Sequence, residues 1–543
     1  MKSSSSLPEH LYLVRTPASQ HLHKPSPDTM GAKGYNLHRM TEAGLNVPVA
    51  LVIGTHYTHA PQDCFLPVFS VGLHALEEST GLLFGDDRNP LILSVRSGAP
   101  VSMPGMLETL LNIGLSDHTL PGLVRQTGNP RMAWDAYRRL VASYGEVVAG
   151  LPASLFEAEI DRVTQGQDER LLDFSQLRQL TRSFLGLYET HAGRPFPQDA
   201  REQLSGAIEA VFASWNADKA VQYRRIHQID HDMGTAVILQ RMVFGNTGGH
   251  SGAGVGFTRD PGTGEPRLWV DFLANAQGED VVSGRRNAHG HATLAAVAPD
   301  AWKQLQASAQ ALEQHFGDMQ DFEFTVQDGV LHMLQTRSAK RTPLAAARIA
   351  LDLLNEGLID SAEALQRTGA IDAAALGTVR MVTGDDPDNA PAPLAQAHPA
   401  CPGVVSGAIA LDAQAVERLV QRGVPAILVR QDAETSDIAA MQGAQGLLTA
   451  RGARTSHAAV VARQMGKTCL VGCTALQIHD TARTVQIGNQ TLNENDPITL
   501  DGNEGAIYAG HARSALVPDT ALRAWLEDLR HQHQVKQAHH HRH

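Results

Sequence analysis

The 543-residue sequence has few cysteines, few aromatic residues, no excess of positive charge and no long hydrophobic run. Its formal net charge is −12, which excludes a broad surface for nucleic acid or an anionic membrane, because both require clustered Lys and Arg. No apolar run approaches the roughly 18 residues of a membrane span, and the start, MKSSSSLPEHLYL, lacks the apolar core of a secretory signal. We therefore expect a cytoplasmic protein in which any phosphate binding is local.

The scarce cysteines also exclude a disulfide scaffold. Only Cys64, Cys401, Cys469 and Cys473 occur, and the last two are spaced C-x3-C without a second pair of ligands, so packed, reduced thiols are expected rather than a zinc site. The end of the chain, HQHQVKQAHHHRH, is rich in histidine. An interrupted polar tract at a terminus is typical of a disordered end.

At roughly 150 residues per domain, the length predicts three or four domains of mixed α/β and α+β class. Residues 1–340 alternate helical and strand-like patterns, with a mainly helical part at about 115–230. Residues 341–403 predict two helices joined at Glu356-Gly357 and then a Pro/Ala-rich linker, TGDDPDNAPAPLAQAHPACPG. Residues 404–512 predict a compact α/β domain, and residues 513–543 a polar helix with the His-rich tail.

The stretch ARTSHAAVVARQMGK, residues 453–467, predicts a short helix. Thr455 or Ser456 can cap it by accepting a hydrogen bond from a first-turn N–H, and Gly466 provides a C-terminal stop. His457 then falls in the first turn, where the helix dipole disfavours imidazolium and favours an anion attached to the ring. The position suits a phosphorylated imidazole, although an exposed or structural histidine is the commoner reason for such a placement.

A second segment, FGNTGGHSGAGVGFTRDPGTG, is rich in glycine. Six of its positions are glycine, so no side chain prevents successive N–H groups of a loop from closing on a phosphate. The segment is neither a Walker loop nor a dinucleotide fingerprint, since it lacks G-K-[ST] and strand-like residues follow it. A Gly-rich hairpin connection is an equally good interpretation. The glycines are Gly245, Gly248, Gly249, Gly252, Gly254 and Gly256.

A third segment, QDFEFTVQDGVLHMLQTRSAKR, places Asp321 and Glu323 on one strand face, alternating with phenylalanines that point to a core. Gln335 and Arg337 alternate on the returning strand. A two-residue loop would put Glu323 and Gln335 on opposite faces, whereas a three-residue loop puts both on one face. We predict the three-residue loop, because only that loop builds a metal site. A carboxylate and an amide oxygen suit Mg²⁺, whereas the alternative is an exposed polar strand face.

Two cations complete the pattern, Lys33 in MGAKGYNL and Arg96 in LSVRSGAPVSMPGM. A strand that ends in Arg96 before a Ser/Gly/Pro loop places a fixed cation beside a mobile flap. A nucleoside triphosphate carries about four negative charges, so phosphoryl transfer requires several converging cations. Lys33, Arg96, Arg337 and a metal meet that requirement, although single charges of this kind more often lie on a surface.

Together, these segments resemble the pyruvate phosphate dikinase family from about residue 28 to 510. The resemblance implies an ATP-grasp nucleotide-binding domain at 1–340 and a swivelling phosphohistidine domain at 404–512. In that family the histidine matching His457 attacks ATP, AMP leaves, and inorganic phosphate then takes part of the pyrophosphoryl group as PPi. The segments that carry the resemblance are GAKGYNL, LSVRSGAPVSMPGM, MVFGN, NAQGEDVVSG, QDFEFTV, LQTRSAKRT, ILVR, RTSHAAVVARQMG and LDGNEG.

The resemblance also implies roles for single residues. His457, Arg96 and Arg337 are implied to be catalytic, and Glu323 and Gln335 to hold Mg²⁺. The residues implied to bind ATP are Lys33, Arg96, Met103 and Gly105 of a phosphate lid, Val243, Gly252, Gly254, Glu279, Asp321 and Arg337. The residues implied to support the phosphohistidine are Arg454, Thr455 and Ser456, and Thr455 matches a position that a regulatory kinase modifies in some relatives.

The sequence departs from the family in three places. The C-terminal barrel that binds phosphoenolpyruvate and pyruvate is expected to be absent, because the chain stops about where it would begin. Ala253 stands where the family commonly has threonine, which removes a hydrogen bond worth about 0.5–1.5 kcal/mol. Ala453-Arg454 stands where the family usually has Gly-Met, and an arginine there, as in the related phosphoenolpyruvate synthases, can pair with a phosphate on His457.

These patterns predict an ATP-dependent, Mg²⁺-requiring phosphotransferase that loads His457 and passes the phosphoryl group to an acceptor outside these domains. ATP and inorganic phosphate are the expected substrates, and the acceptor is a separate phosphoenolpyruvate/pyruvate-binding protein or a small molecule. Nucleic acid and membranes are not expected partners, and a homodimer stays open. The alternatives are a catalytically retired nucleotide-sensing or assembly protein derived from the enzyme, and a piece of a longer enzyme.

Overall fold

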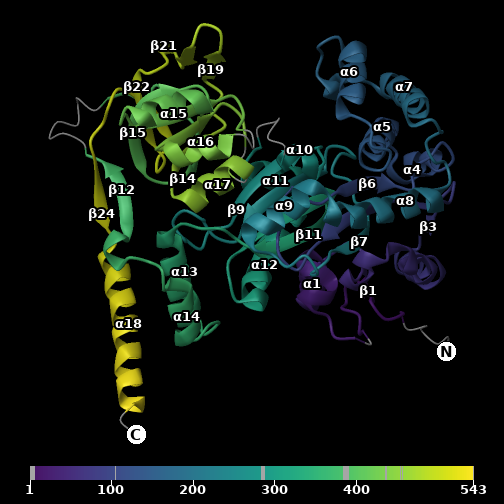
Figure 1. Cartoon of the computed structure of the whole chain (residues 1–543), viewed down its shortest axis with the longest axis horizontal. Coiled ribbons are helices and arrows are strands. Elements are labelled where there is room, and N and C mark those ends of the chain that lie inside the picture. The colour runs from purple at the N-terminus through teal and green to yellow at the C-terminus, as the bar shows by residue number, and fades with distance from the viewer. Residues whose placement is uncertain are drawn as a thin grey trace. The chain divides into compact units, whose positions relative to one another are not determined.

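The computed structural model describes residues 7–21, 23–103, 105–282, 288–382, 391–433, 437–452, 454 and 456–541. Its elements form two compact units, Met1–Ser251 with Phe324–Arg337, and Gly252–Glu323 with Ser338–His543. Both units mix helices and strands, in agreement with the predicted α/β class (Figure 1). The units do not follow the four predicted segments, because residues 252–323 are grouped with the C-terminal half. The predicted domain boundaries therefore stay a prediction.

The first unit contains a five-stranded antiparallel sheet in the order β1-β2-β7-β5-β6. Strand β2 is buried along its whole length, and α1 and α8 both pack against the central strands. Because helices pack against this sheet, β2 and β7 are nearly continuous runs of apolar residues rather than alternating ones. The elements are β1 (Leu11–Val14), α1 (Pro27–Glu42), β2 (Ala50–Ile53), α2 (Phe65–Pro67), α3 (Leu73–Thr80), β3 (Leu83–Phe84), β4 (Pro90–Leu91), β5 (Leu93–Gly98), β6 (Thr109–Ile113) and β7 (Ala236–Arg241).

The stretch predicted to be mainly helical is confirmed as helical. The Asp173 side chain and Gln176 form a reciprocal capping box at the start of α7, and Leu177, Leu180 and Phe184 of that helix are buried at helical spacing. This part shares one hydrophobic core with the sheet. Its helices are α4 (Leu120–Thr127), α5 (Pro130–Val147), α6 (Ala153–Thr164), α7 (Phe174–Ala192), α8 (Ala200–Ala213) and α9 (Asp218–His227).

A second sheet has the order β11-β10-β8-β9. Its β10–β11 hairpin belongs to both units, since the division falls between Glu323 and Phe324. The elements are β8 (Gly252–Phe257), β9 (Trp269–Ala274), α10 (Gly278–Val282), α11 (His291–Val297), α12 (Pro299–Phe316), β10 (Gln320–Gln327) and β11 (Val330–Ser338).

The predicted α/β domain is built on an eight-stranded sheet in the order β13-β23-β22-β15-β16-β17-β18-β14. The four strands β15 to β18 are parallel, and antiparallel strands flank them. The elements are β15 (Val404–Ala410), α15 (Ala413–Gln421), β16 (Ala426–Arg430), α16 (Ile438–Gly443), β17 (Gly446–Thr449), α17 (His457–Met465), β18 (Thr468–Val471), β19 (Leu476–His479), β20 (Thr484–Ile487), β21 (Gln490–Asn493), β22 (Pro497–Asp501) and β23 (Ala506–Ala509).

The connector contains the two predicted helices, α13 (Pro343–Asn355) and α14 (Ser361–Thr368), and Gly357 between them has φ 76°. The predicted linker is wrong in its second half. β13 (Ala395–Gln396) and β14 (His398–Cys401) join the eight-stranded sheet, because β14 pairs with β18 and β13 with β23. Residues 383–390 lie outside the described part of the chain.

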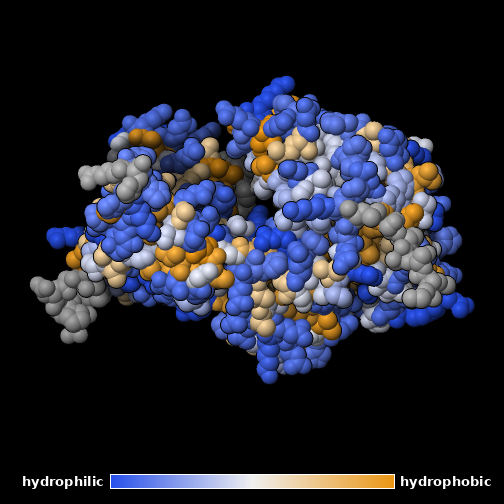
Figure 2. Space-filling view, turned by 90° about the horizontal axis from the view of Figure 1, so that it is seen from below, coloured by the Kyte–Doolittle hydropathy of each residue, from blue (hydrophilic) through white to orange (hydrophobic). Residues whose placement is uncertain are grey.

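The C-terminal region forms β24 (Ser514–Pro518), which pairs with β12 (Gly377–Met381), and helix α18 (Thr520–His540). The predicted disordered tail is therefore wrong up to His540, because the helix that buries Leu522, Leu526 and Leu529 against α13 and α14 continues through the histidines. In the described part of the chain, each helix is too short or too polar to cross a membrane. The face drawn in Figure 2 is mainly hydrophilic, with hydrophobic residues in small patches.

All four cysteines have free, buried thiols, as predicted. Burial raises the pKa of Cys64 and of Cys401 to about 12 in each case, so these thiols stay protonated at neutral pH.

Candidate active site

Arg96 lies near the end of β5 and is half-buried. Its Nη2 donates to Gln240 Oε1 at 2.5 Å and to the Leu334 carbonyl oxygen at 3.4 Å. Gln240 is itself buried on β7, and its Nε2 donates to the Pro48 carbonyl oxygen at 3.0 Å. The guanidinium is thus held in one orientation, as a fixed cation rather than a free surface charge.

Lys33 is placed by a break in α1 at Gly31, whose φ is 71° and ψ 164°. The break lets the Ala32 N–H donate to the Ala99 carbonyl oxygen at 3.0 Å. A Cβ at Gly31 would lie 2.0 Å from the Gly98 carbonyl oxygen, so only glycine fits there. Lys33 comes two residues after Gly31, and its Cβ lies 3.4 Å from where a Cβ on Gly98 would be. The lysine therefore lies beside the end of β5.

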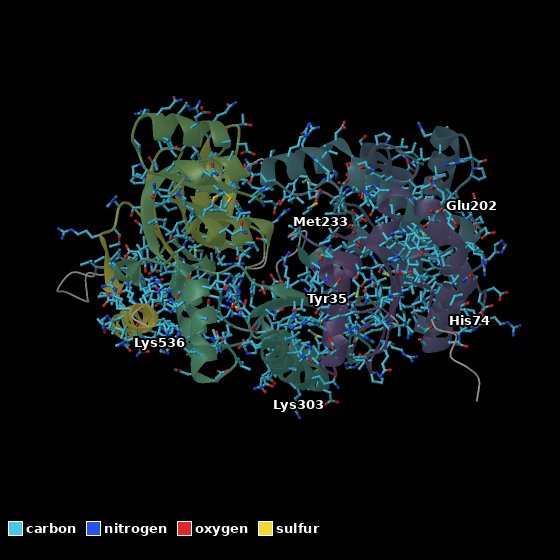
Figure 3. All side chains as sticks on the ribbon, turned by 60° about the horizontal axis from the view of Figure 1, so that its bottom comes forward. Tyr35, His74, Glu202, Met233, Lys303 and Lys536 are labelled. Carbon is cyan, nitrogen blue, oxygen red and sulfur yellow. The ribbon has the colours of Figure 1, made fainter. Side chains whose placement is uncertain are left out.

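The strand that carries Gln335 and Arg337, β11, is held by side chains of α1 and β5. Asn36 of α1 donates from Nδ2 to the Thr336 carbonyl oxygen at 3.0 Å, and Arg96 reaches the carbonyl of the residue before Gln335. Tyr35 marks this part of α1 in Figure 3. The first unit thus brings Lys33 and Arg96 to the C-terminal part of β11. Their roles toward ATP stay predictions.

The predicted phosphate lid is anchored at one end. Met103 is 7% exposed and lies in a hydrophobic cluster with Trp215, which Met233 also joins (Figure 3). Gly105 has φ 71°, and its carbonyl oxygen lies 3.5 Å from Lys219 Nζ. Pro104 between them lies outside the described residues. The loop is therefore packed at Met103 rather than open along its whole length.

β10 and β11 are joined by a two-residue turn, so the predicted three-residue loop is wrong. Asp328 has φ 49° and Gly329 φ 82°, the two positive values of a type I′ turn. The Asp328 N–H donates to Ser251 Oγ at 2.9 Å, and Thr247 Oγ1 donates to Asp328 Oδ1 at 3.0 Å. These bonds support the left-handed conformation of the one residue in the turn that is not glycine.

Beyond the turn, the burial pattern of β11 indicates that the pairing of the hairpin shifts by one residue. The alternation of buried residues along β11 changes phase after Met333, so that the next buried side chain is Thr336 and not Gln335. The Ala339 N–H donates to the Met319 carbonyl oxygen, one residue away from the register that the turn sets. Such a shift is typical of a β-bulge. The shift turns Gln335 away from the buried face of β11. The length of the turn alone therefore does not decide whether Glu323 and Gln335 lie on one face. Their role as metal ligands stays a prediction.

The alternation predicted for β10 is confirmed. Phe322 and Phe324 are buried at 2% and 1% exposure, whereas Asp321 and Glu323 are half-buried on the other face. Carboxylate oxygens on an accessible face, together with an amide oxygen, are a donor set that Mg²⁺ accepts. No three His, Cys, Asp or Glu side chains among the described residues are grouped to hold a metal. Magnesium at this face would therefore draw its remaining ligands from phosphate and water.

The Gly-rich segment is a strand from Gly252 onward, so the loop ends before Gly252, and contact of Gly252 and Gly254 with ATP stays a prediction. Both glycines lie in β8, which is buried along its whole length. A Cβ at Gly252 would lie 2.3 Å from the ring of Phe272, and one at Gly256 would lie 2.6 Å from the ring of Phe322. Glycine is needed here so that aromatic rings can lie across the strand.

Two further predicted ligands lie in different units. Val243 follows β7 in the first unit and is buried, and the N–H of the preceding Met242 donates to the Ile92 carbonyl oxygen at 2.8 Å. Glu279 lies in the first turn of α10 in the second unit. Their contact with ATP stays a prediction.

The predicted helix around His457 is confirmed. Ser456 is the N-cap, with φ −60° and ψ 157°, and its Oγ accepts from the Ala459 N–H at 3.3 Å. His457 is the first residue of α17, and Gly466 ends the helix in the left-handed conformation at φ 66°. Thr455 and the side chain of His457 lie outside the described residues.

Arg454 is held by β9 of the same unit. Its guanidinium carbon lies 4.1 Å from the centre of the Trp269 ring, and its Nε lies 3.5 Å from Asp271 Oδ1. The side chain is 22% exposed. Burial lowers the pKa of Arg454, whereas the nearby Asp271 carboxylate opposes that shift. The arginine that was expected to support a phosphohistidine therefore already has an aromatic and an anionic partner.

Arg463 of α17 fixes the backbone of that arginine. It is fully buried, and its Nη1 donates to the carbonyl oxygens of Ala400 and Arg454, each at 2.8 Å. Its guanidinium also lies 5.2 Å from the Phe257 ring centre and 5.5 Å from that of Trp269. The backbone carbonyl of Arg454 is thus tied to the helix that contains His457.

Two stretches of the chain match known protein families. Residues 73–294 and 288–357 match the family described as pyruvate phosphate dikinase, AMP/ATP-binding domain, and residues 423–505 match the one described as PEP-utilising enzyme, mobile domain. The chain belongs to the pyruvate phosphate dikinase family.

Curated relatives agree with this assignment. The chain is 42% identical to pyruvate, phosphate dikinase of Clostridium symbiosum over 89% of its own length and 56% of that protein. It is 40% identical to the chloroplastic enzyme of Mesembryanthemum crystallinum, over 92% of this chain and 54% of that protein. It is also 40% identical to pyruvate, phosphate dikinase 1 of Zea mays, over 93% and 55%. The chain spans about half the length of the relatives it matches.

Within this member of the pyruvate phosphate dikinase family, three residues of the candidate site were missed from the sequence. Gln240 lies in the apolar run AVILQRMVF and Arg463 in HAAVVARQM, and a polar side chain in such a run signals a buried, paired group. Trp269 gave no such signal, because its contact with Arg454 joins positions far apart in the chain.

Proposed function

We propose that this chain carries out the ATP-dependent part of a dikinase reaction, in which His457 receives a phosphoryl group from ATP in the presence of inorganic phosphate. The main support is the position of His457 as the first residue of α17 behind the Ser456 cap. The first turn of a helix has N–H groups without a backbone partner inside the helix, and they favour the neutral, nucleophilic imidazole and stabilise a phosphate on the ring. Membership of the dikinase family supplies the choice of donor.

The proposed reaction has two steps. First, a ring nitrogen of His457 bonds to the β-phosphorus of ATP while the bond from that phosphorus to the α–β bridging oxygen breaks. AMP leaves with this oxygen and its electron pair, and the ring gives up its proton. An oxygen of inorganic phosphate then bonds to the γ-phosphorus, whose bond to the β–γ bridging oxygen breaks. PPi leaves, and the β-phosphoryl group stays on His457 with that oxygen.

The proposed nucleotide site lies in an ATP-grasp domain. Lys33, Arg96 and Arg337 are proposed to neutralise the triphosphate, which suits the fixed guanidinium of Arg96 and the place of Lys33 at the end of β5. Magnesium, when bound, would neutralise phosphate charge and orient the chain of phosphates. Glu323 and Gln335 are its proposed ligands. The other proposed ATP contacts are Met103, Gly105, Val243, Gly252, Gly254, Glu279 and Asp321.

The acceptor of the phosphoryl group is proposed to lie outside these residues. The relatives' names give pyruvate and phosphate as substrates, so a carboxylate of the pyruvate class is the proposed acceptor. A separate protein that binds it, or a further part of a longer chain, would supply that site.

ATP labelled at the β- or the γ-phosphorus tests the proposal. With Mg²⁺ and without inorganic phosphate, we expect both labels on the wild-type protein. With inorganic phosphate, the β label stays and the γ label leaves as PPi. The His457→Asn variant is expected to take up neither label. A wild-type protein that is never labelled, or an Asn variant that keeps the label, would overturn the proposal.

A further inference from the structure

Arg454 lies three positions before His457 and contacts two residues of β9, Trp269 and Asp271. We propose that Arg454 is a phosphate-sensitive latch: its side chain holds on to β9 while the histidine is unphosphorylated, and it exchanges Trp269 and Asp271 for the phosphate once His457 is loaded. This inference rests on the proposed function. It adds a positioning residue that couples the state of the histidine to the contact with β9.

The contact with Asp271 is weak enough to be exchanged. Arg454 Nε lies 3.5 Å from Asp271 Oδ1, whereas a charge-assisted hydrogen bond of this type is ordinarily about 2.7–2.9 Å long. The hydrogen bond from Arg454 Nη2 to the Val270 carbonyl oxygen is also 3.5 Å long. The guanidinium carbon lies 4.1 Å from the centre of the Trp269 ring, well inside the roughly 6 Å range of a cation–π contact. Its ion pair with Asp271 is therefore long for a bidentate pair of arginine and carboxylate.

A phosphate on the imidazole is the stronger competitor. A protein-bound phosphate carries about −1.5 to −2 charges at neutral pH and three acceptor oxygens, against one charge on Asp271. Arginine binds such a group through two parallel N–H donors, which the Asp271 contact does not use. Asp260 and Arg267, which also lie near Arg454, carry charges of opposite sign.

The backbone geometry allows the side chain to change partners without unfolding. Arg463 Nη1 fixes the Arg454 carbonyl oxygen at 2.8 Å, and Ser456 fixes the start of α17. Three residues span at most about 10–11 Å, so the Arg454 backbone stays near the histidine that follows. The guanidinium can therefore leave β9 by side-chain rotation alone, while its backbone stays within the short length of chain that separates Arg454 from His457.

Hydrogen–deuterium exchange of the full chain, with and without loading by MgATP and inorganic phosphate, measures the latch. In the wild type we expect loading to raise the exchange rate of peptides that contain residues 269–274 at least threefold. In Asp271→Asn and Arg454→Met, this exchange is expected to be fast before loading and to change little afterwards. Loaded wild-type protein with unchanged exchange at β9 would overturn the latch.

The lifetime of the label on His457, after nucleotide is removed, separates the two roles of Arg454. Arg454→Met is expected to lose the label several-fold faster than the wild type, because the phosphate loses its guanidinium. Asp271→Asn is expected to keep the label at least as long as the wild type, since it frees Arg454 for the phosphate. Equal label loss in Arg454→Met and wild type would contradict the exchange of partners.

Arg451→Met is the matched control, because Arg451 is exposed and pairs only loosely with Asp432, at 3.8 Å. It should change neither the hydrogen exchange of β9 nor the lifetime of the label.

If Arg454→Met fails to fold, Arg454→Lys retains the charge without the planar donor pair and is expected to shorten the label lifetime. If the wild type takes up label but hydrogen exchange at β9 does not change, only the latch is contradicted. If the wild type is never labelled, the proposed function is contradicted, and the latch with it.

Discussion

Arg96 Nη2 lies 2.5 Å from Oε1 of Gln240, a residue on the neighbouring strand that is 2% exposed. A buried amide that is itself hydrogen-bonded gives the guanidinium a fixed direction before any ligand arrives. Electrostatic catalysis depends on charges that are already oriented, because they then require no reorganisation in the transition state. The pair thus supports Arg96 as a prearranged cation.

Replacing Arg96 by methionine should weaken ATP binding by about 10–100-fold, since a hydrogen bond to a charged group contributes about 1.5–3 kcal/mol. Titration calorimetry with a non-hydrolysable ATP analogue measures the loss. Lys303→Met on α12, an exposed cation marked in Figure 3, is the control and should bind as the wild type does. Equal affinity of the Arg96 variant and the wild type would remove Arg96 from the proposed site.

Gly31→Ala should destabilise the protein and misplace Lys33, because the new Cβ would lie 2.0 Å from the Gly98 carbonyl oxygen and the φ, ψ pair is one that essentially only glycine adopts. Gly44 also has a positive φ, but nothing lies within 4 Å of a Cβ there. We expect Gly44→Ala to cost about 1–2 kcal/mol and Gly31→Ala clearly more in urea unfolding. Similar costs for the two variants would show that the contact with Gly98 is unimportant.

Removing the helix cap should loosen the segment that carries His457. Ser456→Ala loses the acceptor for the Ala459 N–H and is expected to cost about 0.5–2 kcal/mol, whereas Ser456→Asp retains a cap and costs less. Thermal unfolding, together with hydrogen exchange of α17, tests this order. Ser205→Ala on α8 is the control, since that hydroxyl bonds within a helix to the Arg201 carbonyl oxygen and caps nothing.

The stability of the first unit should decrease as pH falls from about 6.5 to 4. Burial, together with the nearby Arg241, lowers the pKa of His332 to about 4 in the folded chain. The unfolded chain then binds more protons in this range, so the stabilisation is complete above the unfolded pKa near 6.5 and is lost on acidification. Burial and His38 lower the pKa of His21 to about 4 as well.

Urea unfolding at several pH values measures this dependence. His332→Gln is expected to reduce the slope of stability against pH between 4 and 6.5. His74→Gln is the control, since the His74 side chain is 64% exposed on α3 (Figure 3), and its slope should match the wild type. A wild-type stability that does not change over this range would contradict the buried, neutral state of His332.

Local sequence signals predicted the parts of the site that local physics determines. The cap at Ser456 and the stop at Gly466 depend on backbone groups within a few residues, and the alternation along β10 depends on one buried face. The family resemblance, carried by short motifs spread along the chain, is confirmed by the family matches.

The wrong predictions share a physical reason, which is that contacts between residues far apart in the chain determined the structure at these places. The turn at Asp328 was undetermined by hydrophobicity, and Ser251 and Thr247 support its left-handed conformation. The glycines of β8 make room for the Phe272 and Phe322 rings, which no local pattern reveals. Only strand pairing with β18 showed that part of the apparent linker belongs to a sheet.

The C-terminal helix has one further consequence. Residues 531–540 of α18 are all exposed, so the last turns keep their shape through hydrogen bonds within the helix and local propensity rather than through burial. These turns should therefore open more often than the part of α18 that buries Leu522, Leu526 and Leu529, so that one continuous helix joins a stable half to a fraying end.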